Sequence, residues 1–482
     1  MKNVSDVDNS TSTEFRSDQE ISSREKKQSC SHDFSALLQA AIETGLIIVG
    51  LLFVALLLPR QLGGDGTFRY NDLVSLLSTH NLYQPHSRYS LIGPLFSSPL
   101  LWIGIQLRDP LEWANVYNLL LFSLCLLVSY CLLRNHVDRA LLRKFFLMLI
   151  YGSMFVAHLA FYYGEVFTAL CVGFGVFVAL RRFTGVGGWL AVALGVANTP
   201  ATMAGLGLLT FKRMLDSKRL RYIPVPVFTI ACILTEYQLR RGSIFNNGYI
   251  GTHGAKTMMP YSGLSDFSYP FFFGLLSILL SFGQGLLFYA PGLLLPIRKT
   301  LSKWPQDQKI NLYQVYTLWI CFLVGMILVY ARWWDWSGWV FWGPRFFLFA
   351  SIPASFALAV RLICYKEASL GMNLLTLGVF CLSAWASVDG AVFQLEVMHP
   401  WICTIYNHAY SMLCSYTPEY SPLWMPFVFP LRVSPAQMLF LVFSLLVAAY
   451  MVAPLFIHLL KQSWDLIKAF CRDHKKLSLW RF

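Results

Sequence analysis

Long apolar runs separated by short polar loops make up most of this sequence. A helix needs roughly 20 apolar residues to cross a bilayer, and ten runs in the 482-residue chain come close to that length or exceed it. The pattern therefore predicts an all-α polytopic membrane protein with about ten full transmembrane helices. The predicted spans are 35–58, 113–133, 145–163, 166–180, 222–237, 271–295, 312–330, 346–363, 374–388 and 438–460.

Two further apolar segments do not have the pattern of simple spans. Residues 91–107 are short for a span and contain two prolines. Residues 188–211 are long enough, but Asn198-Thr199-Pro200 interrupts them in the middle, and Asn and Pro both favour a reversal of the chain. We therefore expect the first segment to be an interfacial helix in the first outer loop and the second to be a helical hairpin.

The composition supports this class of protein. Hydrophobic residues account for 56% of the chain and charged residues for 13%, whereas soluble domains carry about 25% charged residues. That difference excludes a soluble enzyme. The net charge of +13 comes from short basic clusters between apolar runs. This is the positive-inside pattern of membrane proteins, so we expect no nucleic-acid partner.

The basic clusters also predict the topology. The clusters at 134–144 and 212–221 fall on one side of the membrane if 91–107 does not cross it and 188–211 turns back. That side is then cytoplasmic and holds both termini. The polar residues 1–34 are predicted to be a disordered tail. A transmembrane domain over 35–460 follows, with outer loops at 61–112, 239–270, 332–343 and 389–435 and a basic tail at 461–482.

Two carboxylates at predicted membrane boundaries are candidates for acid–base chemistry. Asp65 follows the first span between two glycines, where a bent backbone would let it accept a proton from a hydroxyl. A solvated turn explains the same three residues. Glu165 begins a later span, and an acidic residue at that depth is costly and hence a functional candidate, with a helix N-cap as the alternative. Asp72 is interpreted as a surface residue.

Arginine and aromatic residues on the outer side are candidates for binding. Arg88 and Tyr89 directly precede the segment 91–107, and Arg88 could bind a phosphate or anchor the chain at the headgroups. Residues 331–346 contain five tryptophans. Indoles that stack on sugar rings and a guanidinium that grips phosphate would explain this segment, as would an interfacial aromatic belt. Its candidate residues are Trp333, Trp334, Asp335 and Arg345.

The order of these motifs resembles bacterial GT-C class integral-membrane glycosyltransferases, a broad group related to protein O-mannosyltransferases and aminoarabinose transferases. The matching motifs are Gly-Asp-Gly after the first span, Arg-Tyr-Ser-Leu-Ile-Gly-Pro-Leu before the second, and Gly-Glu at the start of a later one. Phe-Gly-Gln-Gly-Leu-Leu-Phe-Tyr-Ala-Pro interrupts a span at 282–291, and Trp-Gly-Pro-Arg-Phe follows at 342–346. The interruption can line a cavity or allow close packing. Gly66 and Gln284 stand where the family often has an acidic residue and an arginine.

The resemblance implies a GT-C-like fold and transfer of a sugar, with inversion, from a polyprenyl-phosphate donor. The acceptor would be a glycan, lipid or protein at the outer face of a bacterial inner (plasma) membrane. Asp65 would be the base, with Glu165 next in line, and Arg88 or Arg345 would neutralise the phosphate. The lipid-linked donor is the one cofactor-like group implied, and a divalent metal is left open because one carboxylate makes a poor hard-cation site. The substrate-binding residues implied are Arg88, Tyr89, His253, Lys256, Trp333, Trp334, Asp335 and Arg345.

Two other interpretations stay open on the sequence. A lipid or polysaccharide transporter without chemistry would also be polytopic, although the predicted spans contain no polar cluster at mid-membrane depth. A catalytically silent homologue is the second. Cys403 and Cys414, both in an outer loop, could form a disulfide in an oxidising compartment or stay as buried thiols.

The predicted topology can be tested by cysteine labelling. In a background without native cysteines, Lys218→Cys should react with a membrane-impermeant maleimide only after the membrane is permeabilised, because the basic cluster 212–221 is predicted to be cytoplasmic. His253→Cys should react in intact cells. Labelling of Lys218→Cys from outside would contradict the predicted hairpin.

Overall fold

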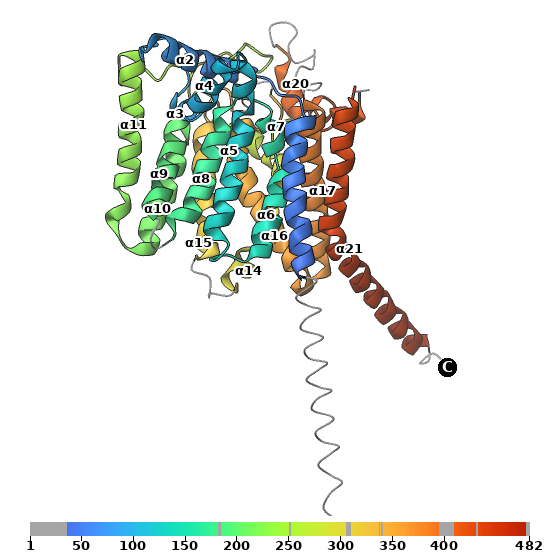
Figure 1. Ribbon diagram of the computed structural model, residues 1–482. Coiled ribbons are helices and arrows are strands. Elements are labelled where there is room, and N and C mark those ends of the chain that lie inside the picture. Colours follow the sequence, from blue (N-terminus) through green and yellow to red (C-terminus); the bar gives the residue numbers. More distant parts are fainter. Residues whose placement is uncertain are drawn as a thin grey trace, which may run out of the picture.

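Seven helices in the described part of the chain are long and apolar enough to cross a membrane. The structure is a computed structural model, and it describes residues 36–181, 185–249, 252–304, 310–336, 338, 341–394, 409–429 and 432–478. Figure 1 shows the long helices aligned as one bundle. They are Ala36–Leu57, α5 (Pro110–Leu133), α11 (Pro224–Arg241), α15 (Leu312–Tyr330), Arg345–Ile363, which comprises η4 (Arg345–Ala350) and α16 (Ser351–Ile363), α17 (Leu370–Val392) and α21 (Pro435–Ser478).

The predicted all-α polytopic fold is confirmed, but three of the ten predicted full spans are not single long helices. Residues 145–163 are divided between α6 (Arg139–Tyr151) and α7 (Phe155–Leu159). At the break, the Ser153 hydroxyl donates to the carbonyl of Leu149 at 2.6 Å and accepts the N–H of Phe155 at 3.1 Å. Residues 166–180 belong to the shorter α8 (Gly164–Ala179), and 271–295 are divided among α12 (Phe271–Leu280), α13 (Leu286–Tyr289) and η3 (Pro291–Leu294).

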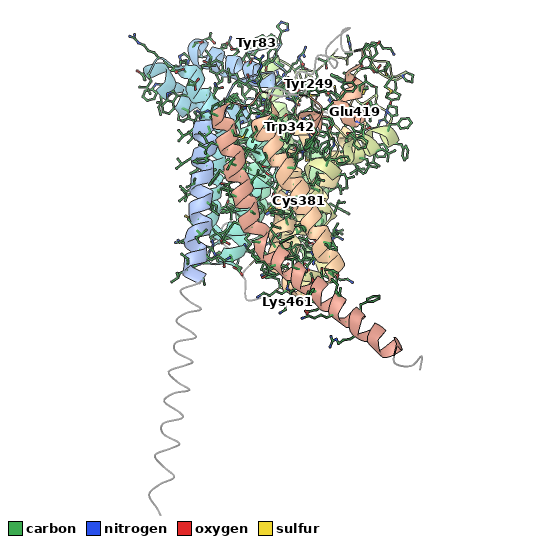
Figure 2. The ribbon with its side chains drawn as sticks, turned by 90° about the vertical axis from the view of Figure 1, so that its right-hand side faces the viewer. Tyr83, Tyr249, Trp342, Cys381, Glu419 and Lys461 are labelled. Carbon is green, nitrogen blue, oxygen red and sulfur yellow. The ribbon has the colours of Figure 1, made fainter. Side chains whose placement is uncertain are left out.

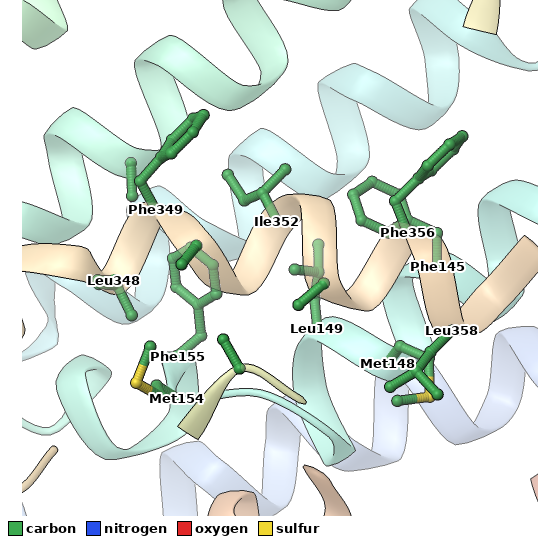
Figure 3. Packing of buried hydrophobic residues seen from close by; sticks show 14 of the residues in the cluster. Phe145, Met148, Leu149, Met154, Phe155, Leu348, Phe349, Ile352, Phe356 and Leu358 are labelled. Atoms are coloured by element: carbon green, nitrogen blue, oxygen red, sulfur yellow. The ribbon is translucent and has the colours of Figure 1, made fainter. Parts of the chain in front are cut away.

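The short helices α6 and α8 lie in the core of the bundle. Side chains on all sides of both helices are buried, which is typical of a helix surrounded by protein. Figure 3 shows Phe145 and Leu149 of α6 packed near Ile352 and Phe356 of α16. The first helix and α11 are different, because only 17% of each apolar window is buried. Their apolar surfaces are therefore left for lipid.

The predicted hairpin is present as α9 (Gly185–Asn198) and α10 (Met203–Ser217), joined by the 3-10 turn η1 (Pro200–Thr202). At its tip, the Asn198 side chain accepts the N–H of Gly93 at 2.9 Å and donates to the carbonyl of Gly164 at 2.8 Å. These two bonds fix the tip against Gly93, in the predicted first outer loop, and Gly164, at the start of α8. At the far end of α10, Gln314 donates to Asp216 at 3.5 Å.

The first outer segment forms α2 (Asp65–Thr79), α3 (Ile92–Leu95) and α4 (Ser98–Gln106), so the predicted interfacial helix is two short helices. We call this end of the bundle the α2 end (Figure 1). Tyr83, Tyr249 and Trp342 lie toward it, and Lys461 lies at the opposite end (Figure 2). The remaining elements are η2 (Leu220–Tyr222), α14 (Arg298–Ser302), η5 (Tyr365–Glu367), α20 (Ser411–Tyr416), η6 (Pro418–Tyr420) and η7 (Met425–Phe427).

The structure describes most of the predicted basic tail and none of the predicted disordered tail. Residues 461–478 of the predicted basic tail belong to α21, which stays helical to Ser478 and extends beyond the bundle in Figure 1. The predicted disordered tail, 1–34, lies outside the described residues.

The glycine-rich interruption between α12 and α13 serves close packing. A Cβ on Gly283 would lie 2.0 Å from the carbonyl oxygen of Cys414, and the Gly283 N–H donates to the carbonyl of Ser415 at 3.0 Å. The Ser421 hydroxyl donates to the carbonyl of Phe282 at 2.7 Å. Backbone-to-backbone contact with the segment around α20 therefore explains why the helix stops there.

A buried ion cluster joins the first helix to α6. Glu43 is fully buried and pairs with Arg143 at 2.7 Å and Lys144 at 3.2 Å. We expect Glu43→Gln to destabilise the protein by about 3–5 kcal/mol, because two buried cations lose their carboxylate. The apparent melting temperature of the purified protein in one detergent measures this change.

The half-exposed ion pair between Lys212 and Asp216 provides the matched control. Asp216→Asn should change the free energy of unfolding by only about 0–1 kcal/mol. Equal melting temperatures for wild type and Glu43→Gln would show that the buried cluster does not hold the first helix.

Candidate active site

A cavity of about 840 Å³ lies at the α2 end of the bundle. Its size is within the usual range for small-molecule sites. Residues from α2, the start of α8, the tip between α9 and α10, and the end of α11 line it, together with three outer loops. Nine of the ten predicted site residues line it, namely Asp65, Arg88, Tyr89, Glu165, His253, Trp333, Trp334, Asp335 and Arg345.

Lys256 is the one predicted site residue that does not line the cavity. Its side chain is exposed, and the Nζ donates to the carbonyl of Ser262 at 3.3 Å within its own loop. The sequence predicted Lys256 in an outer loop but could not show the direction of its side chain. The prediction that it assists binding is therefore not supported by its position.

Asp65 is held at the cavity wall by the turn that leads into α2. Gly63 and Gly64 have φ angles of 41° and 49°, a region that favours glycine. A Cβ on Gly64 would also lie 2.7 Å from the ring of Phe341. The two glycines therefore let the chain leave the first helix sharply and begin α2 with Asp65.

The Asp65 carboxylate has two partners. One oxygen lies 2.7 Å from Nη1 of Arg345, and the other accepts the hydroxyl of Tyr89 at 2.6 Å. Burial raises the pKa of Asp65, but Arg345, the Tyr89 hydrogen bond and Arg69 together outweigh burial and hold the pKa below its usual value of 3.8. Asp65 is therefore ionised at neutral pH.

Arg345 is buried beneath aromatic rings. Its guanidinium carbon lies 4.2 Å from the ring centroid of Phe341, 5.0 Å from that of Phe346 and 5.6 Å from that of Tyr163. Such contacts stabilise a cation and restrict its direction. Gln284, which stands where the resembled family often has an arginine, donates to the carbonyl of Phe341 at 2.9 Å. Gln284 thus fixes the backbone of the residue that covers Arg345.

Trp342 anchors the same segment from the other side. Its indole N–H donates to the fully buried Asp389 of α17 at 2.6 Å, and its ring lies edge-on to Tyr289 at 5.1 Å. Gly343 follows with a φ of 67°. The Trp-Gly-Pro-Arg motif is therefore a buried anchor, a turn and a cation aimed at Asp65.

Three arginines hold the loop that presents Tyr89. Arg69 of α2 donates to the carbonyl of Ser90 at 3.2 Å. Arg240 of α11 donates to the carbonyl of Tyr89, and its neighbour Arg241 donates to that of Ser87 at 2.8 Å. This loop, residues 84–91, is therefore fixed by charged donors on its backbone.

The carboxylates of Glu236 and Asp72 complete this arrangement. Glu236 accepts the N–H of Leu91 at 2.8 Å and pairs with Arg240 at 3.2 Å. Asp72 pairs with Arg240 at 2.9 Å. Asp72, interpreted as a surface residue, is partly exposed, and the sequence did not show that Arg240 lies beside it.

Glu165 lies in the first turn of α8, as the N-terminal position predicts, and it is buried at the cavity wall. One of its carboxylate oxygens has no hydrogen-bond partner among the described residues. Next to it, a Cβ on Gly164 would lie 2.6 Å from the guanidinium carbon of Arg69. The Gly-Glu motif thus makes room for an arginine and places a carboxylate in the same cavity.

Aromatic side chains form one side of the cavity. Tyr249 lies edge-on to Tyr89 at 6.3 Å and to Trp333 at 5.8 Å. Trp333 contacts Trp334 at 5.9 Å, and a Cβ on Gly254 would lie 2.6 Å from the Trp334 ring. These rings present both apolar faces and polar edges, which suits a sugar.

Gly66 also has a structural explanation. A Cβ at this position would lie 3.2 Å from both the Cβ and the carbonyl oxygen of Tyr162. The hydroxyl of Tyr162 is in turn bonded to Ser97 at 2.5 Å. An acidic side chain, which the resembled family often has there, would therefore require Tyr162 to shift by a few tenths of an ångström.

Several cavity residues were missed by the sequence analysis. Arg69 and Arg241 line the cavity, as do Tyr237, Tyr249 and the tip of the hairpin. For the hairpin tip, the polar Asn-Thr-Pro sequence at the predicted outer end was a signal that could have placed it in the cavity. Arg241 gave no such signal, because a basic residue at the end of a span is usually a headgroup anchor.

The described residues also bear on the metal and the disulfide that the sequence left open. The described residues contain no group of three or more His, Cys, Asp and Glu residues that could hold a metal ion. Cys414 is disulfide-bonded, while Cys403 lies outside the described residues. The pairing of these two cysteines therefore stays a prediction.

Comparison with known proteins gives one structural likeness. No family model matches the chain, and no curated protein matches it. Among solved structures, the chain is similar to ArnT from Cupriavidus metallidurans bound to undecaprenyl phosphate, with 13% sequence identity and a TM-score of 0.46. The match covers 86% of this chain and 77% of that one.

Proposed function

We propose that this protein is a membrane glycosyltransferase that moves a sugar from a polyprenyl-phosphate donor to an acceptor hydroxyl at the extracytoplasmic face. The observation that carries the proposal is the ionised Asp65, paired with the buried Arg345 at the wall of a cavity. Arginine and aromatic side chains line the same cavity. It therefore combines a base, cations for a phosphate and rings for a sugar.

In this reaction the acceptor oxygen forms a bond with the anomeric carbon as the bond from that carbon to the phosphate oxygen breaks. Attack from the face opposite the phosphate gives inversion. The acceptor proton passes to Asp65, and the electron pair of the broken bond leaves on the polyprenyl phosphate. Cavity arginines stabilise that developing charge.

The lowered pKa of Asp65 supports its proposed role as the base. Asp65 has a lowered pKa because of Arg345, Tyr89 and Arg69, despite its burial, so at neutral pH it is in the form that accepts a proton. It is a weak base, and its contribution depends on being held in line with the acceptor. Tyr89 and Arg345 provide that restraint from two sides.

The first functional prediction concerns Asp65→Asn. This change keeps the shape of the side chain but removes the proton acceptor, so transfer should fall by about 10²–10⁴-fold. The measurement is transfer of radiolabelled sugar from a polyprenyl-phosphate donor by the purified enzyme in nanodiscs. Donor binding should persist.

Asp266→Asn is the matched control, because Asp266 is exposed in an outer loop and does not line the cavity. Its φ of 55° is also tolerated by asparagine. Near-normal transfer by Asp65→Asn would move the role of base to Glu165. Activity in both Asp65→Asn and Glu165→Gln would refute an outer carboxylate as the base.

A second functional prediction separates the charge of Arg345 from its geometry. Arg345→Gln removes the cation that holds the pKa of Asp65 down, so the acidic limb of the rate against pH should move to higher pH. Arg345→Lys keeps the charge, so the limb should stay near its wild-type position. Its rate should still fall roughly 10²-fold, because the acceptor's base is no longer held in place. Identical pH profiles for wild type and Arg345→Gln would contradict the role of the ion pair.

A further inference from the structure

The last helix, α21, is much longer than a membrane span. It contains 44 residues, which at 1.5 Å per residue amount to about 66 Å, roughly twice the apolar thickness of a bilayer. Figure 1 shows its lower part turning away from the bundle. Pro454 lies inside the helix, and an internal proline removes one hydrogen bond and bends the axis. We call the part that leaves the bundle, residues 460–478, the α21 extension.

One face of α21 packs against the bundle as far as the start of this extension. The buried residues of that face recur at every fourth position and are Val447, Met451, Leu455 and Leu459. Gln462 then accepts the side-chain N–H of Asn373 of α17 at 3.2 Å and donates to the carbonyl of Ala368 at 3.2 Å. These two bonds fix the rotation of α21 about its own axis at the point where it leaves the bundle.

The opposite face carries an apolar stripe that continues into the extension. Its members follow one another at intervals of three or four residues, which keeps them on one side of a helix. They are Val442, Leu446, Ala449, Ala453, Ile457, Leu460, Trp464 and Ile467. The members other than alanine are between 48% and 66% exposed, and only 28% of the apolar window of α21 is buried, so the stripe faces lipid along the span. Because the extension turns away from the bundle, the same face is directed toward the bilayer surface.

A basic stripe runs beside the apolar one. Lys461, Lys468 and Arg472 are spaced by seven and four residues, so they share one side of the helix. All three are exposed, and none forms an ion pair with a described residue. The Nζ of Lys468 lies 5.3 Å from the ring centroid of Trp464, so the two stripes adjoin. Basic residues next to an apolar face are typical of helices that lie in a membrane interface.

We propose that the α21 extension is an amphipathic anchor that binds an anionic bilayer surface at the end of the bundle opposite the α2 end. The apolar stripe enters the boundary between headgroups and acyl chains, and the three basic residues bind lipid phosphates. The partner is a lipid surface because the stripe continues directly from the face that contacts lipid along the span. The spanning part of α21 also tethers the extension within reach of that bilayer, which favours docking. This proposal does not depend on the proposed function.

Contact with lipid can be measured on the full-length protein in nanodiscs that contain phosphatidylglycerol. A dansyl amino acid in place of Ile467 should be quenched by lipids that carry a nitroxide high on the acyl chain. The same label in place of Asp465 is the matched control, because Asp465 is exposed and lies on the opposite side of the helix. Equal quenching at both positions, or none at Ile467, would overturn the anchor. A blue-shifted label at Ile467 that no lipid quenches would indicate a protein contact and would also overturn it.

The role of the charges is tested in the variant Lys461→Gln/Lys468→Gln/Arg472→Gln. Each basic residue near an anionic surface strengthens binding about fivefold, so the ratio of quenched to unquenched label at Ile467 should fall by roughly 100-fold. In nanodiscs of neutral lipid alone, the variant and the wild type should give the same ratio. Equal quenching of variant and wild type in phosphatidylglycerol would overturn the anionic-lipid site.

The matched control for charge is Lys299→Gln/Lys303→Gln/Lys366→Gln. These three lysines are exposed on or beside α14 and η5, at the same end of the bundle as the extension. Their removal changes the net charge equally and should leave the quenching at Ile467 unchanged. A fall as large as in the first variant would show a general effect of net charge and overturn the assignment to the basic stripe. Both tests report lipid contact without sugar transfer, so their outcome is separate from that of the Asp65 variants.

Discussion

The ion pair between Asp65 and Arg345 is the contact around which the cavity is arranged. Each partner is held by a different part of the bundle, Asp65 by the glycine turn after the first helix and Arg345 by the anchored motif before α16. A buried cation and a buried carboxylate are both costly alone. Their pairing makes it possible to keep an ionised carboxylate at a wall lined with aromatic rings, and in the proposed transfer it sets the direction from which the acceptor approaches.

The long spans could be predicted from the sequence because length and hydropathy alone define them. The interrupted helices could not, since their breaks depend on contacts between distant segments. The stop after α12 requires the backbone of Cys414 to approach Gly283, and hydropathy does not register such an approach. In the core, α6 and α8 are surrounded by protein, so their apolar runs are a sign of burial and need not match the thickness of a bilayer.

For the cavity, the sequence supplied residues whose type and neighbours are unusual, such as Asp65 between glycines and Arg345 after Gly-Pro. The sequence did not show which side chains are buried at the cavity or which of them form ion pairs. Arg241 looks like any basic residue at a helix end, and only the fold shows that it is buried at the cavity with no ion pair to a described residue. The ion pair of Asp72 was also invisible in the sequence, because its partner Arg240 is far away in the sequence and adjacent in space.

The position of α11 has a mechanical consequence. Only 17% of its apolar window is buried in protein, yet its last residues hold the loop that presents Tyr89 to Asp65. A helix that is mostly solvated by lipid takes its tilt from the surrounding bilayer as well as from protein contacts. The thickness and composition of the membrane are therefore coupled, through α11, to the alignment of Tyr89 with Asp65, the proposed base.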